Sequence, residues 1–291
     1  MTVTSHFCGP THYRRCGSGD RLLVLLHGWP QTGHCWRHLM EPLAERYTVV
    51  APDLRGYGRS EARGPGRDKR AAAADLSRLL AELGFDRADV VGHDRGARVA
   101  HRWALDRPDE IGRLALLDVL PTREVMRSVD KDSAGFLWHW FFHLQPDLPE
   151  LLIGGDVEAY LRFFFERQAL HPIEEEAVAE YVAAFSDPRV LRASLEDYRA
   201  GFHEDLAADE ADFQARRRLT QPLLVLWGEQ GGLGGADVAG IWSRYAERVT
   251  TAAIPDCKHF LPEEQPGRVL AALRAFLKEQ PTCNSSEGAS P

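Results

Sequence analysis

The sequence predicts an α/β fold in which helices flank a mostly parallel central sheet and a helical segment is inserted into the chain. Short apolar runs alternate with amphipathic helical patterns over residues 1–120 and again over 215–280. Between these parts, residues 121–214 lack strand signals and are rich in aromatic and charged residues, which indicates a helical cap. With 291 residues, 44% of them hydrophobic, the chain is long enough to bury a substantial core.

The elements of this core follow from apolar periodicity. Buried runs predict strands at Leu22–Leu26, Thr48–Ala51, Asp89–Val91, Leu114–Leu117, Pro222–Trp227 and Val249–Ile254. Apolar residues at helical spacing predict helices at Lys69–Leu83, from Ala97 to the stop at Arg107-Pro108, and at Gly267–Leu277. The Ser-, Gly- and Pro-bearing tail, 281–291, is expected to be disordered.

Gly92-His93-Asp94-Arg95-Gly96 lies where a predicted strand turns into a helix, and it has the spacing of a nucleophile elbow, G-x-S-x-G. Flanking glycines permit the sharp turn that exposes the central side chain. A serine attacking an alkyl carbon would form an ether that water does not readily cleave, whereas a carboxylate forms an ester that water opens. Asp94 therefore indicates chemistry at an sp³ carbon bearing a halide or an epoxide oxygen. An ordinary polar turn is the alternative interpretation of so short a motif.

Such a nucleophile needs a base, and His259 follows the last predicted strand. The acid that would orient it has two sources in the sequence. Asp118 ends the strand Leu114–Leu117, while Glu229 and Asp237 follow the strand that ends at Trp227. We favour Asp118 because the glycine-rich loop after Trp227 lacks an acid at the expected offset.

Arg95 and Arg98 lie three residues apart on the first helical turn after Asp94, so both are predicted to face one pocket. Two like charges ~4 Å apart repel by about 4 kcal/mol at an effective dielectric constant of 20. A pair of guanidinium groups would cancel the repulsion between Asp94 and an anionic substrate and would bind its carboxylate. The alternative is that Arg98 is an ordinary surface residue of the helix.

Several turns resemble those of α/β-hydrolases: His27-Gly28-Trp29-Pro30 is similar to their oxyanion loop, and the turn from Asp53 to Ser60 follows their D-x-R-G-x-G-x-S pattern. Over nearly the whole chain the sequence resembles the fluoroacetate (haloacetate) dehalogenases of that superfamily. The segments that carry this resemblance are Gly92–Arg98, Leu117–Thr122, His139-Trp140, Gln145-Pro146, Glu196–Gly201 and His259–Glu264. Lys258 and the glycine run 231–235 depart from the family pattern.

The resemblance implies a role for each matching residue. Asp94 would be the nucleophile, His259 the base and Asp118 its partner, while Arg95 and Arg98 would bind the substrate carboxylate. His139, Trp140 and Tyr198 would bind the departing halide through N–H and O–H donors. Without the resemblance, the aromatic run Trp138–Phe142 would be interpreted as a patch facing the core.

The expected reaction converts a haloacetate, fluoroacetate above all, to glycolate and halide through an ester on Asp94. His259 would activate the water that opens this ester, with the backbone N–H groups of Trp29 and Arg95 as the oxyanion hole and with no metal or cofactor. An epoxide hydrolase using the same aspartate is the first alternative, although a neutral epoxide has no use for Arg98. A non-enzymatic ligand-binding relative is the second, although such a protein would be expected to have lost a member of the triad.

Composition excludes other classes of protein. A net charge of −8 without a basic stripe argues against a nucleic-acid partner, and no apolar stretch approaches the roughly 20 residues of a membrane span. The N-terminus lacks the design of a secretory signal, and the five cysteines (Cys8, Cys16, Cys35, Cys257 and Cys283) fit no metal-ligand spacing. We therefore expect a cytoplasmic enzyme whose cysteines are reduced and whose substrates are small 2-haloacids. The family resemblance implies a homodimer.

Overall fold

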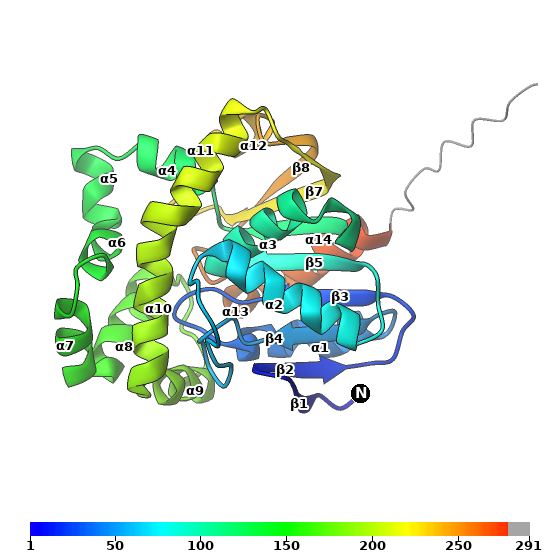
Figure 1. Cartoon of the computed structure of the whole chain (residues 1–291), viewed down its shortest axis with the longest axis horizontal. Coiled ribbons are helices and arrows are strands. Elements are labelled where there is room, and N and C mark those ends of the chain that lie inside the picture. The colour runs from blue at the N-terminus through cyan, green and yellow to red at the C-terminus, as the bar shows by residue number, and fades with distance from the viewer. Residues whose placement is uncertain (279–291) are drawn as a thin grey trace, which may run out of the picture.

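One twisted sheet organises the protein, which we describe from a computed structural model of residues 1–278 (Figure 1). Within these residues eight strands pair in the order β1-β2-β4-β3-β5-β6-β7-β8, and all pairs from β4 to β8 are parallel. The strands are β1 (Thr4–Cys8), β2 (Thr11–Cys16), β3 (Leu22–Leu26), β4 (Thr48–Pro52), β5 (Ala88–His93), β6 (Ile111–Leu117), β7 (Leu219–Gly228) and β8 (Ala246–Ile254). The predicted fold class is confirmed. The tail 281–291 and Cys283 lie outside the described residues.

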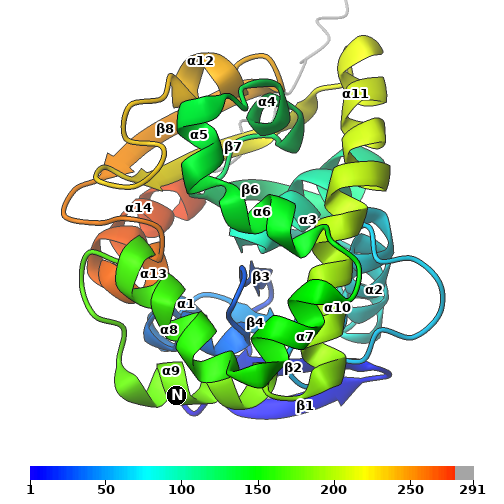
Figure 2. The same cartoon turned by 90° about the vertical axis from the view of Figure 1, so that its left-hand side faces the viewer.

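Helices cover both faces of the sheet, as Figures 1 and 2 show. One face carries α2 (Lys69–Glu82) and α3 (Asp94–Asp106), and the other carries α1 (Arg37–Ala44), α13 (Leu261–Glu264) and α14 (Pro266–Lys278). The short helix α12 (Val238–Trp242) packs beside β8. Because both faces are covered, the central strands are rich in apolar residues, and every residue of β3, β4 and β5 is buried. None of the helices within residues 1–278 is long and apolar enough to cross a bilayer.

The chain between β6 and β7 is helical, and we call residues 122–214 the helical insertion. It contains α4 (Thr122–Arg127), α5 (Lys131–Phe136), α6 (Trp138–His143), α7 (Leu148–Gly155), α8 (Val157–Gln168), α9 (Glu175–Phe185), α10 (Pro188–Ala200), a π-helical turn (Gly201–Asp205) and α11 (Leu206–Gln214). These helices lie at the end of the sheet where the parallel strands terminate (Figures 1 and 2). The insertion therefore stands over the strand ends that carry Asp94 and Asp118.

The first two strands were not predicted from the sequence. β1 and β2 form an antiparallel hairpin, and β2 pairs antiparallel with β4. Four of the five residues of β1 are exposed, so its sequence, Thr-Ser-His-Phe-Cys, lacks the apolar run that predicted the buried strands. The remaining predicted strands and helices are confirmed, with ends that differ by a few residues.

Gly96 sets the distance between helix α3 and strand β3. A Cβ atom on this residue would lie 2.4 Å from the His27 carbonyl oxygen and 2.5 Å from that of Leu26. Both neighbours are backbone atoms at the end of β3, a central strand of the sheet, so they cannot move without shifting β3. The close approach brings the start of α3, with Asp94, next to the His27–Pro30 turn.

This contact predicts that Gly96→Ala lowers the free energy of unfolding by about 1–3 kcal/mol, the usual range for overpacking a core. Urea denaturation followed by circular dichroism measures the change. Gly267→Ala in helix α14 is the matched control, because a Cβ there would meet no atom of the described residues, 1–278, within 4 Å. The control should be neutral or stabilising by up to ~1 kcal/mol. A Gly96→Ala protein as stable as wild type would contradict the proposed packing.

Candidate active site

Asp94 stands at the first position of helix α3, on a turn that is tight on both sides. Its φ of 45° lies in the left-handed region, which is uncommon for residues other than glycine. A Cβ on Gly92 would lie 2.7 Å from backbone atoms of Ala97, and one on Gly28 would lie 2.7 Å from Cβ of Asp94. The turn therefore needs glycine at these neighbouring positions, and it holds the Asp94 side chain against the His27–Pro30 turn.

The Asp94 carboxylate is 9% exposed and is kept ionised by its surroundings. Burial by itself raises the pKa of Asp94, but the nearby His259, His93, Arg95 and Arg98 lower it by more, so the net shift is downward. One oxygen, Oδ2, accepts a hydrogen bond from the backbone N–H of Trp29 at 3.0 Å. The other oxygen, Oδ1, is left as the candidate nucleophile.

His259 and Asp118 form a hydrogen-bonded pair beside Asp94. Nδ1 of His259 lies 2.6 Å from Oδ2 of Asp118, and the second Asp118 oxygen accepts from the Gly228 N–H at 3.2 Å. Nδ1 of a neutral His259 carries the proton and donates it in a hydrogen bond to Asp118. Nε2 is therefore unprotonated and can accept a proton from another group. Burial alone would lower the pKa of His259, but the Asp118 carboxylate raises it above its ordinary value.

The other acids considered for this role, Glu229 and Asp237, are not among the residues that line the cavity with Asp94 and His259. Asp237 caps helix α12, accepting from the Gly240 N–H at 2.9 Å, and the Glu229 N–H donates to the Ile254 carbonyl at 3.0 Å. His93, which precedes Asp94, donates from Nε2 to the His259 backbone carbonyl at 2.8 Å. Burial lowers the pKa of His93 to about 3, so it stays neutral and fixes the loop that carries His259.

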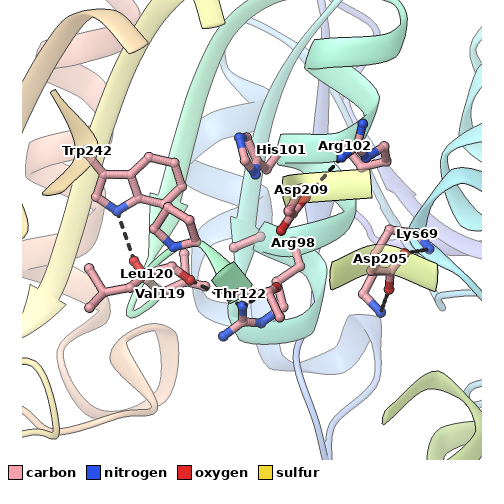
Figure 3. A pocket seen from close by; sticks show the side chains of 12 residues that line it. Lys69, Arg98, His101, Arg102, Val119, Leu120, Thr122, Asp205, Asp209 and Trp242 are labelled. Atoms are coloured by element: carbon pink, nitrogen blue, oxygen red, sulfur yellow. Dashed lines mark hydrogen bonds and ion pairs between the residues drawn. The ribbon is translucent and has the colours of Figure 1, made fainter. Parts of the chain in front are cut away.

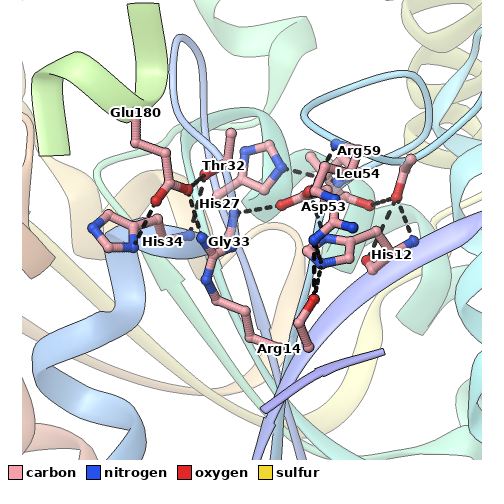
Figure 4. Close-up of polar contacts among 12 residues, drawn as sticks. His12, Arg14, His27, Thr32, Gly33, His34, Asp53, Leu54, Arg59 and Glu180 are labelled. Carbon is pink, nitrogen blue, oxygen red and sulfur yellow. Dashed lines mark hydrogen bonds and ion pairs between the residues drawn. The ribbon is translucent and has the colours of Figure 1, made fainter. Parts of the chain in front are cut away.

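The turn from Asp53 to Ser60 supports the turn that contains Trp29 (Figure 4). The Asp53 carboxylate accepts from the Gly33 N–H at 2.9 Å, from the Arg59 N–H at 2.9 Å and from Nδ1 of His12 at 2.7 Å. Nε2 of His27 accepts from the Leu54 N–H at 2.9 Å. These bonds tie the loops after β3 and β4 together, so the sequence motif D-x-R-G-x-G-x-S acts here as a support for the backbone that contacts Asp94.

Arg98 lines the cavity that contains Asp94 and His259. Figure 3 shows the Arg98 side chain beside Leu120 and Thr122, in a second, smaller pocket that it also lines. One guanidinium nitrogen donates to Oγ1 of Thr122 at 2.7 Å and to the Leu120 carbonyl at 3.2 Å. Within residues 1–278, its buried Nε has no hydrogen-bond partner. Burial, followed by the neighbouring Arg95, lowers the pKa of Arg98 to about 10, so the group is still charged at neutral pH. The alternative that Arg98 is a surface residue is wrong, since it is 8% exposed.

Arg95 is placed differently from the prediction, because its side chain does not line this cavity. Nε of Arg95 lies 2.6 Å from Oδ2 of Asp197, and a second nitrogen donates to the Asp197 carbonyl at 2.7 Å. A fully buried guanidinium needs a counter-charge, and Asp197 supplies it from helix α10. The expectation that both arginines point into one pocket is therefore corrected: only Arg98 does so, and Arg95 acts on Asp94 through its charge.

His139, Trp140 and Tyr198 line the same cavity as Asp94. His139 and Trp140 come from α6 and Tyr198 from α10, with Trp140 and Tyr198 ring centroids 5.9 Å apart. Burial lowers the pKa of His139 to about 4 and raises that of Tyr198 well above its ordinary value. At neutral pH these groups are thus neutral N–H and O–H donors facing one space.

Sequence reasoning missed a second pair beside these donors. Nε2 of His143 lies 2.8 Å from the Tyr160 hydroxyl. The His143 ring packs against Tyr198 at 4.6 Å and against Trp29 at 5.1 Å between centroids. The available signal was the spacing of His143, four residues after His139 and therefore on the same face of α6. Within residues 1–278 no group of three His, Cys, Asp or Glu side chains is arranged to hold a metal ion.

Comparison with known proteins agrees with this architecture. Residues 21–266 match the family model described as the alpha/beta hydrolase fold. A soluble epoxide hydrolase from Corynebacterium sp. is 40% identical over 91% of this chain and 93% of its own length. A fluoroacetate dehalogenase from Burkholderia sp. is 37% identical over 90% of this chain and 88% of its own length. Among solved structures, an epoxide hydrolase without ligand superposes with a TM-score of 0.87 at 38% identity, covering 95% of this chain and 99% of that one.

The His259–Asp118 pair predicts a pKa for His259 that depends on the carboxylate. Wild-type His259 should titrate above its ordinary value, and Asp118→Asn should lower the pKa because burial then acts without the opposing charge. Long-range ¹H–¹⁵N NMR spectra of the imidazoles measure both values, with the His259 signals assigned from their loss in His259→Asn. Equal pKa values in wild type and Asp118→Asn would show that the pair does not form.

Proposed function

The chain belongs to the α/β-hydrolase family, and on that basis we propose that it hydrolyses the carbon–halogen bond of haloacetates, fluoroacetate in particular, to give glycolate and halide. The observation that carries the proposal is a charged, buried Arg98 in the same cavity as the Asp94 carboxylate. Two groups of opposite charge in one cavity suit a substrate that presents a carboxylate on one side and an electrophilic carbon on the other.

In the first step of the proposed reaction, Oδ1 of Asp94 attacks C2 of the substrate. The carbon–halogen electron pair leaves with the halide, and a glycolyl ester forms on Asp94. Arg98 supports this step by neutralising the substrate carboxylate through charge-assisted hydrogen bonds from its guanidinium group. The neutral donors His139, Trp140 and Tyr198 surround the position proposed for the leaving halide.

In the second step, Nε2 of His259 takes a proton from water, which attacks the Asp94 carboxyl carbon. The charge that develops on Oδ2 is stabilised by the Trp29 N–H, which already donates to that oxygen at 3.0 Å. The backbone N–H of Arg95 is the second proposed donor. Collapse of the intermediate releases glycolate and regenerates the Asp94 carboxylate.

Epoxide hydrolysis is the second candidate, and it is favoured by the 40% identity to a soluble epoxide hydrolase. The same Asp94 and His259 would serve, and the Tyr198 hydroxyl would protonate the alkoxide that leaves. Arg98 distinguishes the two candidates, because a neutral epoxide gains nothing from a guanidinium, whereas a haloacetate requires one to approach Asp94. A ligand-binding role without catalysis is less favoured, since Asp94, His259 and Asp118, the residues proposed as nucleophile, base and acid, line one cavity.

Arg98→Met is therefore predicted to lower kcat/KM for chloroacetate and fluoroacetate by more than a hundredfold, which is more than ~2.7 kcal/mol. Arg98→Lys should lose roughly tenfold to a hundredfold, because it keeps the charge but not the planar donor geometry. Turnover of the haloacetates is measured by halide release, and turnover of styrene oxide is measured by diol formation. Arg192→Met, at an exposed position on α10, is the control. Unchanged haloacetate turnover in Arg98→Met, or preferred turnover of styrene oxide, would reject the dehalogenase in favour of the alternative.

Trp140→Phe should lower fluoroacetate turnover by roughly tenfold to a hundredfold while affecting chloroacetate less. Fluoride is the poorer leaving group, so it depends more on each hydrogen bond made in the transition state, and the substitution removes one donor with little change in volume. The quantity to measure is the ratio of kcat on fluoroacetate to kcat on chloroacetate. Trp138→Phe on the same helix is the control, since Trp138 does not line the cavity. A ratio that stays constant in Trp140→Phe would mean that Trp140 only packs.

A further inference from the structure

The cavity above Asp94 is much larger than a haloacetate ion. It encloses about 270 Å³, the volume of roughly nine water molecules at about 30 Å³ each, whereas a haloacetate fills the space of roughly three. The polar groups already assigned to the reaction occupy one part of its wall. The rest of the wall has no role in the reaction of a substrate that small.

This second part of the wall is mostly apolar and comes from two separate segments. The helical insertion contributes Val125, Phe136 and Leu137 together with two serines, Ser128 and Ser133, and the loop after β7 contributes Gly232, Leu233 and Ala236. In Figure 2, the helices α4 and α5 and the two ends of the loop, β7 and α12, all lie in the upper half of the view. The loop is the glycine run 231–235 that departs from the family pattern.

The structure gives a reason for glycine at position 232 of this loop. A Cβ atom on Gly232 would lie 2.8 Å from Cζ of Phe136, so the absence of a side chain lets the Phe136 ring lie directly against the loop. Phe136 is 54% exposed, so its ring is not enclosed by the protein core. The two segments thus form an apolar space that opens from the reacting centre.

We propose that the loop Gly231–Ala236 and residues Val125, Phe136 and Leu137 form a subsite for an apolar substituent on C2 of the substrate, so that the protein acts on 2-haloalkanoates as well as on haloacetates. This inference rests on the proposed function. In a haloacetate, C2 bears the carboxylate, the halogen and two hydrogens, and only the hydrogens are free to be replaced. An alkyl chain in place of one of them would enter the apolar space.

The chemistry of such a substrate is balanced without a co-reactant. Oδ1 of Asp94 displaces the halide from C2 with inversion, and water then attacks the Asp94 carboxyl carbon, leaving the new C2–O bond intact. The products are a 2-hydroxy acid of inverted configuration, a halide ion and one proton. Because the alkyl chain has one apolar space to enter, the carboxylate and halide sites accept one enantiomer in productive orientation, and the other should react at least tenfold more slowly.

The test compares kcat/KM for bromoacetate with that for each enantiomer of 2-bromopropanoate, 2-bromobutanoate and 2-bromohexanoate. Within the 2-alkyl series of the preferred enantiomer, we expect kcat/KM to rise about threefold for each added methylene until the space is filled. Phe136→Ala should lower the ratio of 2-bromohexanoate to bromoacetate about fivefold, and Gly232→Val should lower it at least tenfold by pushing the ring into the space. Gly155→Ala, in helix α7 of the helical insertion, is the control, because Gly155 is not among the residues that line the cavity and a Cβ there would meet no atom of residues 1–278 within 4 Å.

The outcomes separate the two proposals. Turnover of bromoacetate without turnover of 2-bromohexanoate, or with equal ratios in wild type, Phe136→Ala and Gly232→Val, would overturn the subsite and leave the proposed function standing. Equal rates for the two enantiomers, or a product of retained configuration, would also overturn it. Absence of turnover of every haloacid would reject the proposed function and the subsite together.

Discussion

The structure depends on keeping one buried carboxylate ionised at a backbone position that few residues adopt. Burial favours the protonated form of Asp94. Its φ of 45° lies in a region that residues other than glycine rarely adopt. The surroundings compensate: four nearby basic side chains lower the pKa of Asp94, and the Trp29 N–H donates a hydrogen bond to one of its carboxylate oxygens. The close glycines, the Asp53 hydrogen bonds and the His93 contact to the His259 loop all maintain this arrangement.

Helix α3 carries three arginines on one side of this carboxylate, and their partners differ. Arg95 pairs with Asp197 at 2.6 Å, and Arg102 pairs with Asp209 at 2.9 Å and Asp212 at 2.6 Å. The hydrogen bonds of Arg98 within residues 1–278 go instead to a neutral hydroxyl and a backbone carbonyl. Its positive charge is therefore the one directed at the cavity, which is why we assign the substrate carboxylate to Arg98 and a supporting electrostatic role to Arg95.

The sequence predicted the elements whose environment is uniform, and it missed those that depend on distant contacts. Buried strands such as Leu22–Leu26 are apolar throughout and are recognisable alone, whereas the exposed strand β1 is defined by its pairing with β2. Asp94, Asp118 and His259 were identified as candidates because each follows a strand whose end can be predicted. The partner of Arg95 could not be predicted, since Asp197 lies 102 residues away and reaches it only through the packing of α10. The contact between the glycine run 231–235 and Phe136 could not be predicted for the same reason, because the two segments lie far apart in the sequence.

The covalent role of Asp94 is the central claim, and it is tested most directly by intact-protein and peptide mass spectrometry of His259→Asn incubated with chloroacetate. Loss of the base should stop the second step and leave the first, so one glycolyl group should accumulate on the peptide that contains Asp94. Asp94→Asn should show no such adduct at early times. A folded His259→Asn protein that releases chloride without forming the adduct, or that carries it on another residue, would contradict the account.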